Sequence, residues 1–169
     1  MLKVLVPVDG GNNSLHVVRH VLHEFKSNPA LEIHLLNVQP PYSSYITRFI
    51  DEAMVAAEHQ EASQKALQPS RQMLDAAGVP YAVHLAVGKK AVSITDAARQ
   101  LQCDHIVMGT ARKSSLVRVV EDSVTNQVLE LTTVPLLQIA GDPASKAERY
   151  GIPAGVGAGL TWLAVAASE

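Results

Sequence analysis

Short apolar runs alternate along the chain with longer segments in which apolar residues recur every three or four positions. The short runs are rich in Val, Ile and Leu and are bounded by turn residues, which is typical of strands buried inside a parallel sheet. They predict strands at 3–8, 31–38, 81–87, 105–109 and 134–139. Because the intervening segments have a helical period, we expect right-handed crossovers and an α/β fold, an open parallel sheet with helices on both faces.

The first helical segment begins near Asn13 and has an apolar and a polar face. The apolar face, which we expect to meet the sheet, holds Val18, Val21, Leu22 and Phe25. The opposite face holds His16, His20 and His23. Three imidazoles at this spacing align on a helix and would suit a transition metal, whereas a solvated polar face explains the same pattern. We favour the solvated face, because only Glu24 lies near as a further ligand.

A long helical pattern covers about residues 47–77 and contains Pro69. Since proline lacks an N–H, it must kink this helix, divide it or open a second one. Glu58 and His59 within the segment are interpreted as solvated. A shorter helix follows Gly88, and Lys89 and Lys90 beside that turn either face an anion or, as we favour, form a solvated pair. The core stripe of the shorter helix is Ile94, Ala97, Ala98 and Leu101.

Composition narrows the classes of function. The chain has 169 residues, 47% of them apolar and 18% charged, which suits one globular domain with an appendage. A formal net charge of -2 gives no electrostatic reason to expect nucleic acid as a partner. Cys103 is the single cysteine, so no intramolecular disulfide is possible. The N-terminus enters a strand pattern without the apolar region of a signal peptide, which predicts a cytoplasmic domain.

The loop after the fourth predicted strand carries the strongest candidate chemistry. The strand ends at Gly109, and two adjacent cations, Arg112 and Lys113, follow in a loop of small or polar residues. Asp122 or Ser123 then caps the next helix. A helix N-terminus fed by such a loop attracts anions, because unpaired N–H groups and the helix dipole both point at it. The spacing favours a phosphate site, and an ordinary strand-to-helix connection is the alternative.

Two stretches of the sequence resemble the universal stress protein family. The first predicted strand ends in Pro7-Val8-Asp9-Gly10, which is similar to the Pro-Val-Asp-Gly of the family. After the fourth strand, ATP-binding members carry three spaced glycines and a final Ser or Thr. Gly109 matches the first glycine and Ser123 the hydroxyl, but Arg112 and Asp122 replace the other glycines. Asp122 thus places a carboxylate where phosphate would lie, and Arg112 could partly offset it by pairing with phosphate.

The resemblance covers about residues 2–140 and implies the strand order 3-2-1-4-5 of the Rossmann-like, adenine nucleotide alpha hydrolase-like fold. Ligands of such sheets bind at the carboxyl ends of the strands where the order reverses. The resemblance implies ATP or AMP there, with Pro7, Asp9 and Val38 near the base and ribose. The other implied nucleotide contacts are Met108, Gly109, Arg112, Ser123 and Val124. The structural alternatives are that Asp9 only caps a turn and that Val38 is a core residue.

The sequence divides into a universal stress protein domain (1–140), a polar linker (141–150) and an apolar Gly/Ala-rich tail (151–169). From Gly151 to Ala167 the tail contains no charged residue, and its length is near the ~17–25 residues that span a bilayer. Lys146 and Arg149 precede it, as expected for a membrane anchor of a cytoplasmic domain. We favour a tail that docks on its own domain or on a partner subunit, with membrane association as the alternative.

No paired carboxylates, nucleophile–base pair or metal triad is recognisable, so the sequence predicts a non-enzymatic stress-response or regulatory domain, with no metal assigned. By resemblance, the edge strand from Val134 to Ile139 would pair across a two-fold axis in a homodimer. The alternative function is an oligomerising scaffold or regulatory subunit that acts through its tail on a membrane or a protein. A third possibility, an electron-transfer or nucleotidyl-transferring enzyme, rests on fold analogy alone.

Overall fold

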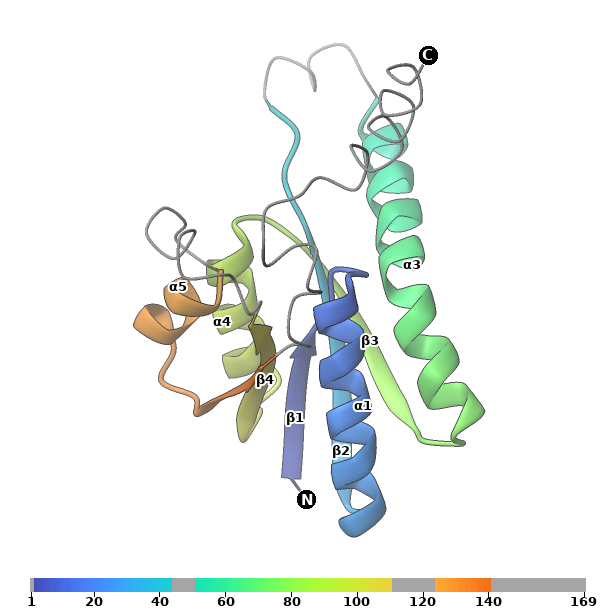
Figure 1. Ribbon diagram of the computed structural model, residues 1–169. Coiled ribbons are helices and arrows are strands. Elements are labelled where there is room, and N and C mark those ends of the chain that lie inside the picture. The colour runs from blue at the N-terminus through green and yellow to red at the C-terminus, as the bar shows by residue number, and fades with distance from the viewer. Residues whose placement is uncertain (1, 44–50, 111–123, 141–169) are drawn as a thin grey trace, which may run out of the picture.

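A computed structural model describes residues 2–43, 51–110 and 124–140, in which strands and helices alternate (Figure 1). The described strands are β1 (Leu2–Pro7), β2 (Leu31–Gln39), β3 (Tyr81–Val87), β4 (His105–Thr110) and β5 (Leu136–Ala140). The described helices are α1 (Asn12–Ser27), α3 (Glu52–Ala76), α4 (Lys90–Gln100) and α5 (Val124–Leu131).

The strands form one parallel sheet in the order β3-β2-β1-β4-β5, which confirms the predicted fold class and topology. β1 lies at the centre of this sheet. It pairs with β2 from Leu2, opposite Leu31, to Pro7, opposite Leu36. Its other edge pairs with β4. The order of the strands therefore reverses between β1 and β4, and their carboxyl ends form the expected crevice.

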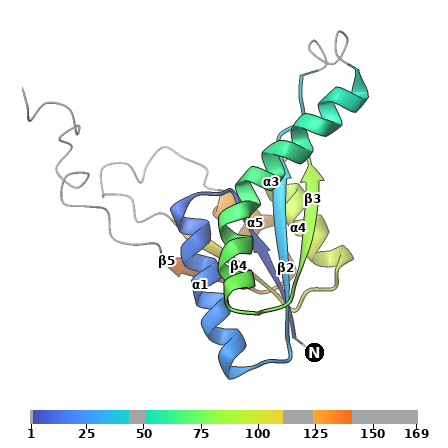
Figure 2. The ribbon, with the colours of Figure 1, turned by 90° about the vertical axis from the view of Figure 1, so that its right-hand side faces the viewer.

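Helices cover both faces of the sheet (Figure 2). Because side chains alternate along a strand, β1 directs Val4 and Val6 toward α1 and α3, and Leu5 toward α4 and α5. The first core also contains Val17, Val21, Ile33, Leu35, Leu67 and Leu74. The second core also contains Leu36, Ile94, Ala98, Ile106 and Val128. Burial on both faces explains why the strands have nearly continuous apolar sequences.

The last strand begins at Leu136, later than the predicted start at Val134. The N–H of Val134 donates to Oγ1 of Thr132 at 3.0 Å, so Val134 closes a turn instead of joining the sheet. Pro135 has no N–H, but its carbonyl accepts a hydrogen bond from Ile106 at 2.8 Å, which aligns the chain with β4. The pairing then continues to Ala140.

α3 is one helix with Pro69 inside it. The predicted start near residue 47 lies outside the described residues. The described helix begins at Glu52, because Asp51 has an extended backbone (ψ 137°) and its side chain accepts a hydrogen bond from the N–H of Ala53. Figure 2 shows that the helix bends without dividing, which is the mildest of the three outcomes predicted for a proline. Its N-terminal part projects beyond the sheet (Figure 1).

The expectation that His59 is solvated is wrong, because this residue is only 8% exposed. Its ring stacks on Tyr42, with the ring centroids 4.8 Å apart, and its Nε2 lies 3.1 Å from the carbonyl oxygen of Pro40. Tyr42 also donates a hydrogen bond to Glu58 at 2.7 Å. These contacts hold the segment after β2 against α3, and they join residues too far apart in the sequence for spacing to reveal them.

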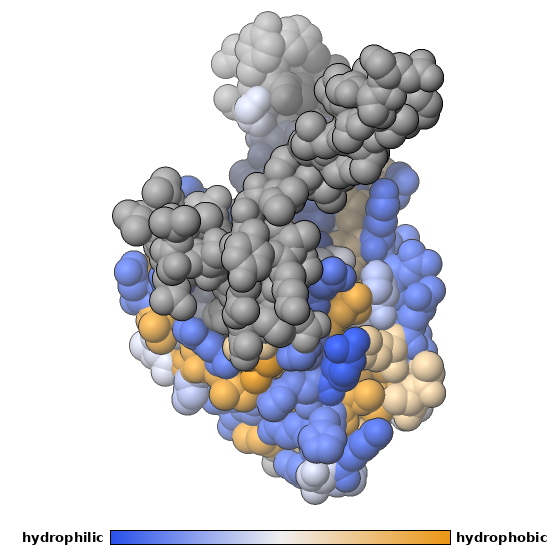
Figure 3. Space-filling view, in the orientation of Figure 1, coloured by the Kyte–Doolittle hydropathy of each residue, from blue (hydrophilic) through white to orange (hydrophobic). Residues whose placement is uncertain are grey.

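On α1, His20 and His23 are exposed. The described residues contain no group of three His, Cys, Asp or Glu side chains that could hold a metal ion. None of the described helices is long and apolar enough to cross a membrane. On the face shown in Figure 3, hydrophobic and hydrophilic residues are interspersed. The linker (141–150) and the tail (151–169) lie outside the described residues, so the hypotheses about them stay predictions.

Candidate functional site

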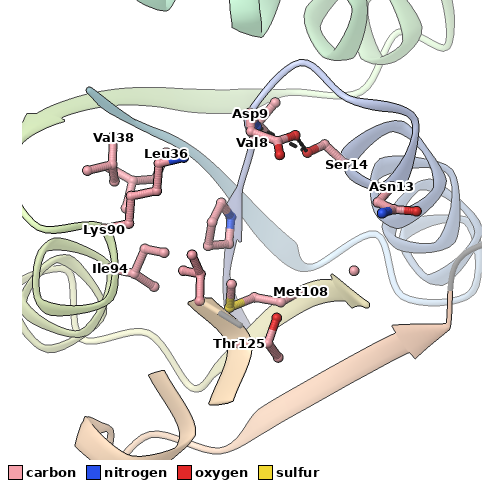
Figure 4. A pocket seen from close by; sticks show the side chains of 13 residues that line it. Val8, Asp9, Asn13, Ser14, Leu36, Val38, Lys90, Ile94, Met108 and Thr125 are labelled. Carbon is pink, nitrogen blue, oxygen red and sulfur yellow. Dashed lines mark hydrogen bonds between the residues drawn. The ribbon is translucent and has the colours of Figure 1, made fainter. Parts of the chain in front are cut away.

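A cavity opens at the carboxyl ends of β1, β2 and β4, beside the first turns of α1, α4 and α5 (Figure 4). It encloses about 150 Å³. It is lined by Pro7, Val8, Asp9, Asn13, Ser14, Leu36, Val38, Lys90, Ile94, Met108, Gly109, Val124 and Thr125. Because sites for whole ligands usually enclose about 300–1,000 Å³, this cavity has room for one ring system and would leave the rest of a larger ligand outside.

Asp9 follows β1 and is fixed by the first turn of α1. Its Oδ1 accepts hydrogen bonds from the hydroxyl of Ser14 and from the N–H of Gly11, the latter at 2.9 Å. Partial burial alone would raise the pKa of the Asp9 carboxyl, but these bonds and the nearby Lys90 ammonium outweigh it, so the pKa lies below its ordinary value. The carboxyl is therefore ionised at neutral pH. Among the described residues, no hydrogen bond ends on Oδ2, so this oxygen can accept one from a ligand.

Asn37 holds the end of β1 in place. It is 2% exposed, and its side-chain amide donates to the carbonyl of Val8 at 2.7 Å. Its own side-chain oxygen accepts from Gln39 at 2.6 Å. Moving the buried Asn37 amide would break these hydrogen bonds, which is unfavourable away from water. The network therefore fixes the backbone immediately before Asp9.

Val38 presents backbone groups as well as its side chain. The carbonyl of Leu36 accepts from the N–H of Val8, and the carbonyl of Gln39 accepts from the N–H of Gly88 beyond β3. Since backbone groups alternate sides along a parallel strand, the N–H and C=O of Val38 point toward the β1 side. β1 ends at Pro7, opposite Leu36. The Val38 pair therefore faces the cavity, where it can bind the polar edge of a flat ring.

Gly109 brings β4 and α1 together. A Cβ at this position would lie 2.9 Å from the backbone oxygen of Asn13 and 3.2 Å from Cγ2 of Val17. Met108, one residue earlier, is 8% exposed and forms the floor of the cavity. The glycine thus lets the first turn of α1 lie close to the crevice.

α5 brings its N-terminal turn to the cavity through Val124 and Thr125. Within the described residues its first turn contains no acidic residue, and a helix N-terminus attracts anions through its dipole and unpaired N–H groups. Arg112, Asp122 and Ser123 lie outside the described residues. The hypotheses that Arg112 and Ser123 contact phosphate therefore stay predictions.

The structure gathers most of the predicted site residues around this one cavity. The six that line it are Pro7, Asp9, Val38, Met108, Gly109 and Val124. That each of them contacts a nucleotide stays a prediction. Asp9 is also part of a turn, as the structural alternative required, and the two roles are compatible because only Oδ1 serves the turn.

The predicted site left out four polar residues of the cavity, namely Asn13, Ser14, Lys90 and Thr125. Ser14 accepts from the N–H of Asp9 at 3.1 Å and also donates to its carboxylate. Its position in the turn after a strand-ending aspartate was an available signal. Lys90 is exposed but also lines the cavity, so the interpretation of a wholly solvated pair was incomplete. Its signal was Gly88, which ends β3 at the same edge of the sheet as Asp9.

Residues 1–139 match the model of the universal stress protein family. A curated relative, universal stress protein MJ0531 of Methanocaldococcus jannaschii, is 27% identical over 139 residues, which are 81% of each chain. The match thus spans the sheet, its helices and the cavity, and ends before the linker.

Solved structures resemble the chain over the same region. Protein MJ0577 has a TM-score of 0.67 at 24% identity and covers 85% of this chain and 98% of its own. The Arabidopsis thaliana protein At3g01520, with AMP bound, has a TM-score of 0.63 at 16% identity and covers 86% of this chain and 97% of its own. Two further universal stress protein structures, in complex with cAMP and with dAMP, have TM-scores of 0.64 and 0.57. At these identities the likeness shows a shared fold.

Proposed function

The chain belongs to the universal stress protein family, and from that premise we propose that its cavity binds an adenine nucleotide and that the protein acts as a non-catalytic stress-response or regulatory domain. One observation carries the proposal. An ionised carboxylate, an unpaired strand edge and a helix N-terminus converge on a single cavity that has room for one ring system.

Each wall of the cavity suits one part of a nucleotide. The Val38 backbone offers one donor and one acceptor to the base edge, between apolar contacts from Ile94 and Met108. Oδ2 of Asp9 accepts a hydrogen bond from a ribose hydroxyl or an amino group. The phosphate lies outside the cavity, toward the first turn of α5. The AMP, cAMP and dAMP bound by structural neighbours support a monophosphate, and ATP is the second candidate.

The same residues support a binding function rather than catalysis. Ser14 is the hydroxyl nearest to the Asp9 carboxylate, but it is 7% exposed and completes the turn by accepting from the Asp9 backbone. Among the described lining residues, no histidine or cysteine is present to act as a base or nucleophile. Occupancy of the cavity, rather than turnover, is then the signal that the protein conveys.

Calorimetric titration of the full chain with AMP, cAMP and ATP, with and without Mg²⁺, tests the binding proposal. We expect saturable binding that Asp9→Asn weakens by about 10- to 100-fold, because hydrogen bonds to charged groups contribute roughly 1.5–3 kcal/mol. Asparagine keeps the shape of the turn. The matched control is Asp96→Asn, an exposed carboxylate on α4 outside the cavity, which should bind like the wild type.

Two results would count against this site. Equal affinity in the wild type and Asp9→Asn would place the nucleotide elsewhere. Absence of heat with all three nucleotides in the wild type would remove the proposal, unless Asp122→Gly restores binding. Restored binding would mean that the Asp122 carboxylate excludes the phosphate by charge.

We further propose that the protein forms a homodimer through the edge from Val134 to Ile139. The supporting observation is that β5 lies at the end of the sheet and leaves Leu137 42% exposed. An apolar edge of this kind is protected when it pairs with a second copy. The alternative is that the tail from Gly151 to Ala167 contacts a membrane or a protein. This alternative rests on the sequence alone.

A further inference from the structure

Lys90 occupies an unfavourable place for a lysine. It is the first residue of α4, and the preceding cap residue is Lys89, whose side chain makes no capping hydrogen bond. The first turn of this helix contains no acidic residue. A cation at a helix N-terminus opposes the helix dipole, which is unfavourable. Neither the cap nor the first turn of α4 therefore compensates the charge of Lys90.

Lys90 faces the nucleotide cavity. Its side chain lines the α4 side, near Val38, while Asp9 approaches from the end of β1 (Figure 4). Asp9 and Lys90 are the two charged side chains among the described lining residues. The remaining described lining residues are apolar or neutral, so these opposite charges set the local electrostatics of the described cavity.

The two charges have opposite effects on a nucleotide. The Asp9 carboxylate is held ionised by its hydrogen bonds from Ser14 and Gly11, so it repels any phosphate nearby. The Lys90 ammonium, on a flexible stem, attracts the same phosphate and offsets part of this repulsion. An uncharged nucleoside gains nothing from this cancellation, because it carries no net charge into the cavity.

From this placement we infer that Lys90 is a specificity residue, which makes the cavity prefer phosphorylated over unphosphorylated adenosine. The inference rests on the proposed function, since it concerns the same cavity. It predicts an anionic nucleoside phosphate as the ligand class, and it assigns a binding role to a residue whose charge opposes the dipole of α4.

The test compares AMP with adenosine as probes of the full-length protein. Lys90→Gln removes the charge, Lys90→Arg keeps it, and Lys89→Gln removes the neighbouring charge outside the cavity. We expect Lys90→Gln to weaken AMP binding by about 3- to 30-fold, the order of magnitude for one unit charge near a phosphate in a partly solvated site. Adenosine affinity should stay within about twofold of the wild type, because an uncharged ligand has no net charge to attract.

The controls distinguish the effect of the Lys90 charge inside the cavity from the effect of any positive charge at this end of α4. Lys90→Arg should keep the preference for AMP, and Lys89→Gln should behave like the wild type. Added salt should weaken AMP binding more in the wild type than in Lys90→Gln, because salt screens the interaction that the variant lacks. Thermal unfolding of each variant establishes that the fold is intact.

Each outcome has one meaning. If the wild type binds both probes and Lys90→Gln leaves the ratio of their affinities unchanged, the inference is wrong and the proposed function stands. An equal loss in Lys89→Gln and Lys90→Gln would also overturn it, because the effect would then belong to the helix end. If the wild type binds neither AMP nor adenosine, the inference is wrong. The proposed function fails as well when ATP and cAMP give no heat and Asp122→Gly does not restore binding.

Discussion

At the scale of single residues, the absence of one side chain decides how closely α1 approaches the sheet. Gly109 occupies the first glycine position of the family motif, where a phosphate-binding role is expected. The structure supplies a packing reason as well, because any Cβ would meet the Asn13 backbone at 2.9 Å. The same turn of α1 carries Ser14, whose hydroxyl donates to the Asp9 carboxylate. One residue therefore links packing of the core to the geometry of the cavity.

Gly109→Ala should lower the free energy of unfolding by about 1–3 kcal/mol, because added volume in a close-packed contact forces backbone shifts. Urea denaturation at an unchanged m-value measures this loss. In the matched control, Gly88→Ala, the new Cβ would meet Oγ of Ser93 at 2.7 Å. That oxygen ends a side chain that can rotate away, so the loss should be smaller. A variant Gly109→Ala with the midpoint of the wild type would contradict the packing role.

At the scale of elements, β2 and β3 are joined by a histidine pair as well as by their backbones. Nδ1 of His34 lies 2.9 Å from Nε2 of His84, and the two rings stack. Burial lowers the pKa of both rings, with Glu32 partly opposing this at His34 and Lys3 reinforcing it. The proximity of His34 lowers the pKa of His84 further. Both rings are therefore held neutral in the folded protein more firmly than in the unfolded chain.

The folded protein should lose stability as the pH falls from about 7 to about 5. The unfolded chain takes up protons near the ordinary histidine pKa of about 6.5, whereas the folded pair resists protonation to lower pH, so unfolding becomes more favourable across this window. Urea midpoints at several pH values measure the effect. His84→Gln should flatten this dependence, and His20→Gln, which changes an exposed histidine on α1, should not. If the urea midpoints of all three proteins change equally with pH, the histidine pair is not the cause of the dependence.

The elements themselves were largely readable from the sequence. β3 and the order of the strands follow from apolar runs, turn residues and family resemblance, because local periodicity determines what each segment can bury. The errors arose where a capping hydrogen bond or a contact between distant residues sets the end of an element or the burial of a residue. Asp51 caps the N-terminus of α3, so this helix begins at Glu52. Thr132 holds Val134 out of the sheet. His59 is buried only because the segment containing Tyr42 folds back over it.

At the scale of the whole molecule, the candidate site depends on chain segments that meet only in the folded state. Asp9 and Gly109 could be placed together, because topology brings the ends of β1 and β4 to one crevice. Lys90 could not be assigned in the same way. Gly88 places Lys90 at the same edge of the sheet, but whether its side chain faces the cavity depends on how α4 packs against β2. Sequence thus located the crevice, whereas the balance of charge inside it required the structure.

The edges of the sheet determine how two molecules would associate. β5 exposes Leu137, and β3 at the opposite edge exposes Val83, Leu85 and Val87. Either edge offers unpaired backbone groups, so the proposed β5 dimer has a definite competitor. We expect light scattering to find a dimer that Leu137→Lys converts to a monomer, because two-fold pairing brings two introduced charges together in the interface.

Leu85→Lys is the matched control, since it places the same charge on the other edge and should leave the dimer intact. The opposite pattern, dissociation by Leu85→Lys alone, would assign the interface to β3. A dimer that survives both changes but is lost when residues 141–169 are removed would assign association to the tail. Only dissociation by Leu137→Lys alone is consistent with a two-fold axis beside β5. Such an axis would leave the cavity of each subunit at the carboxyl ends of its own strands.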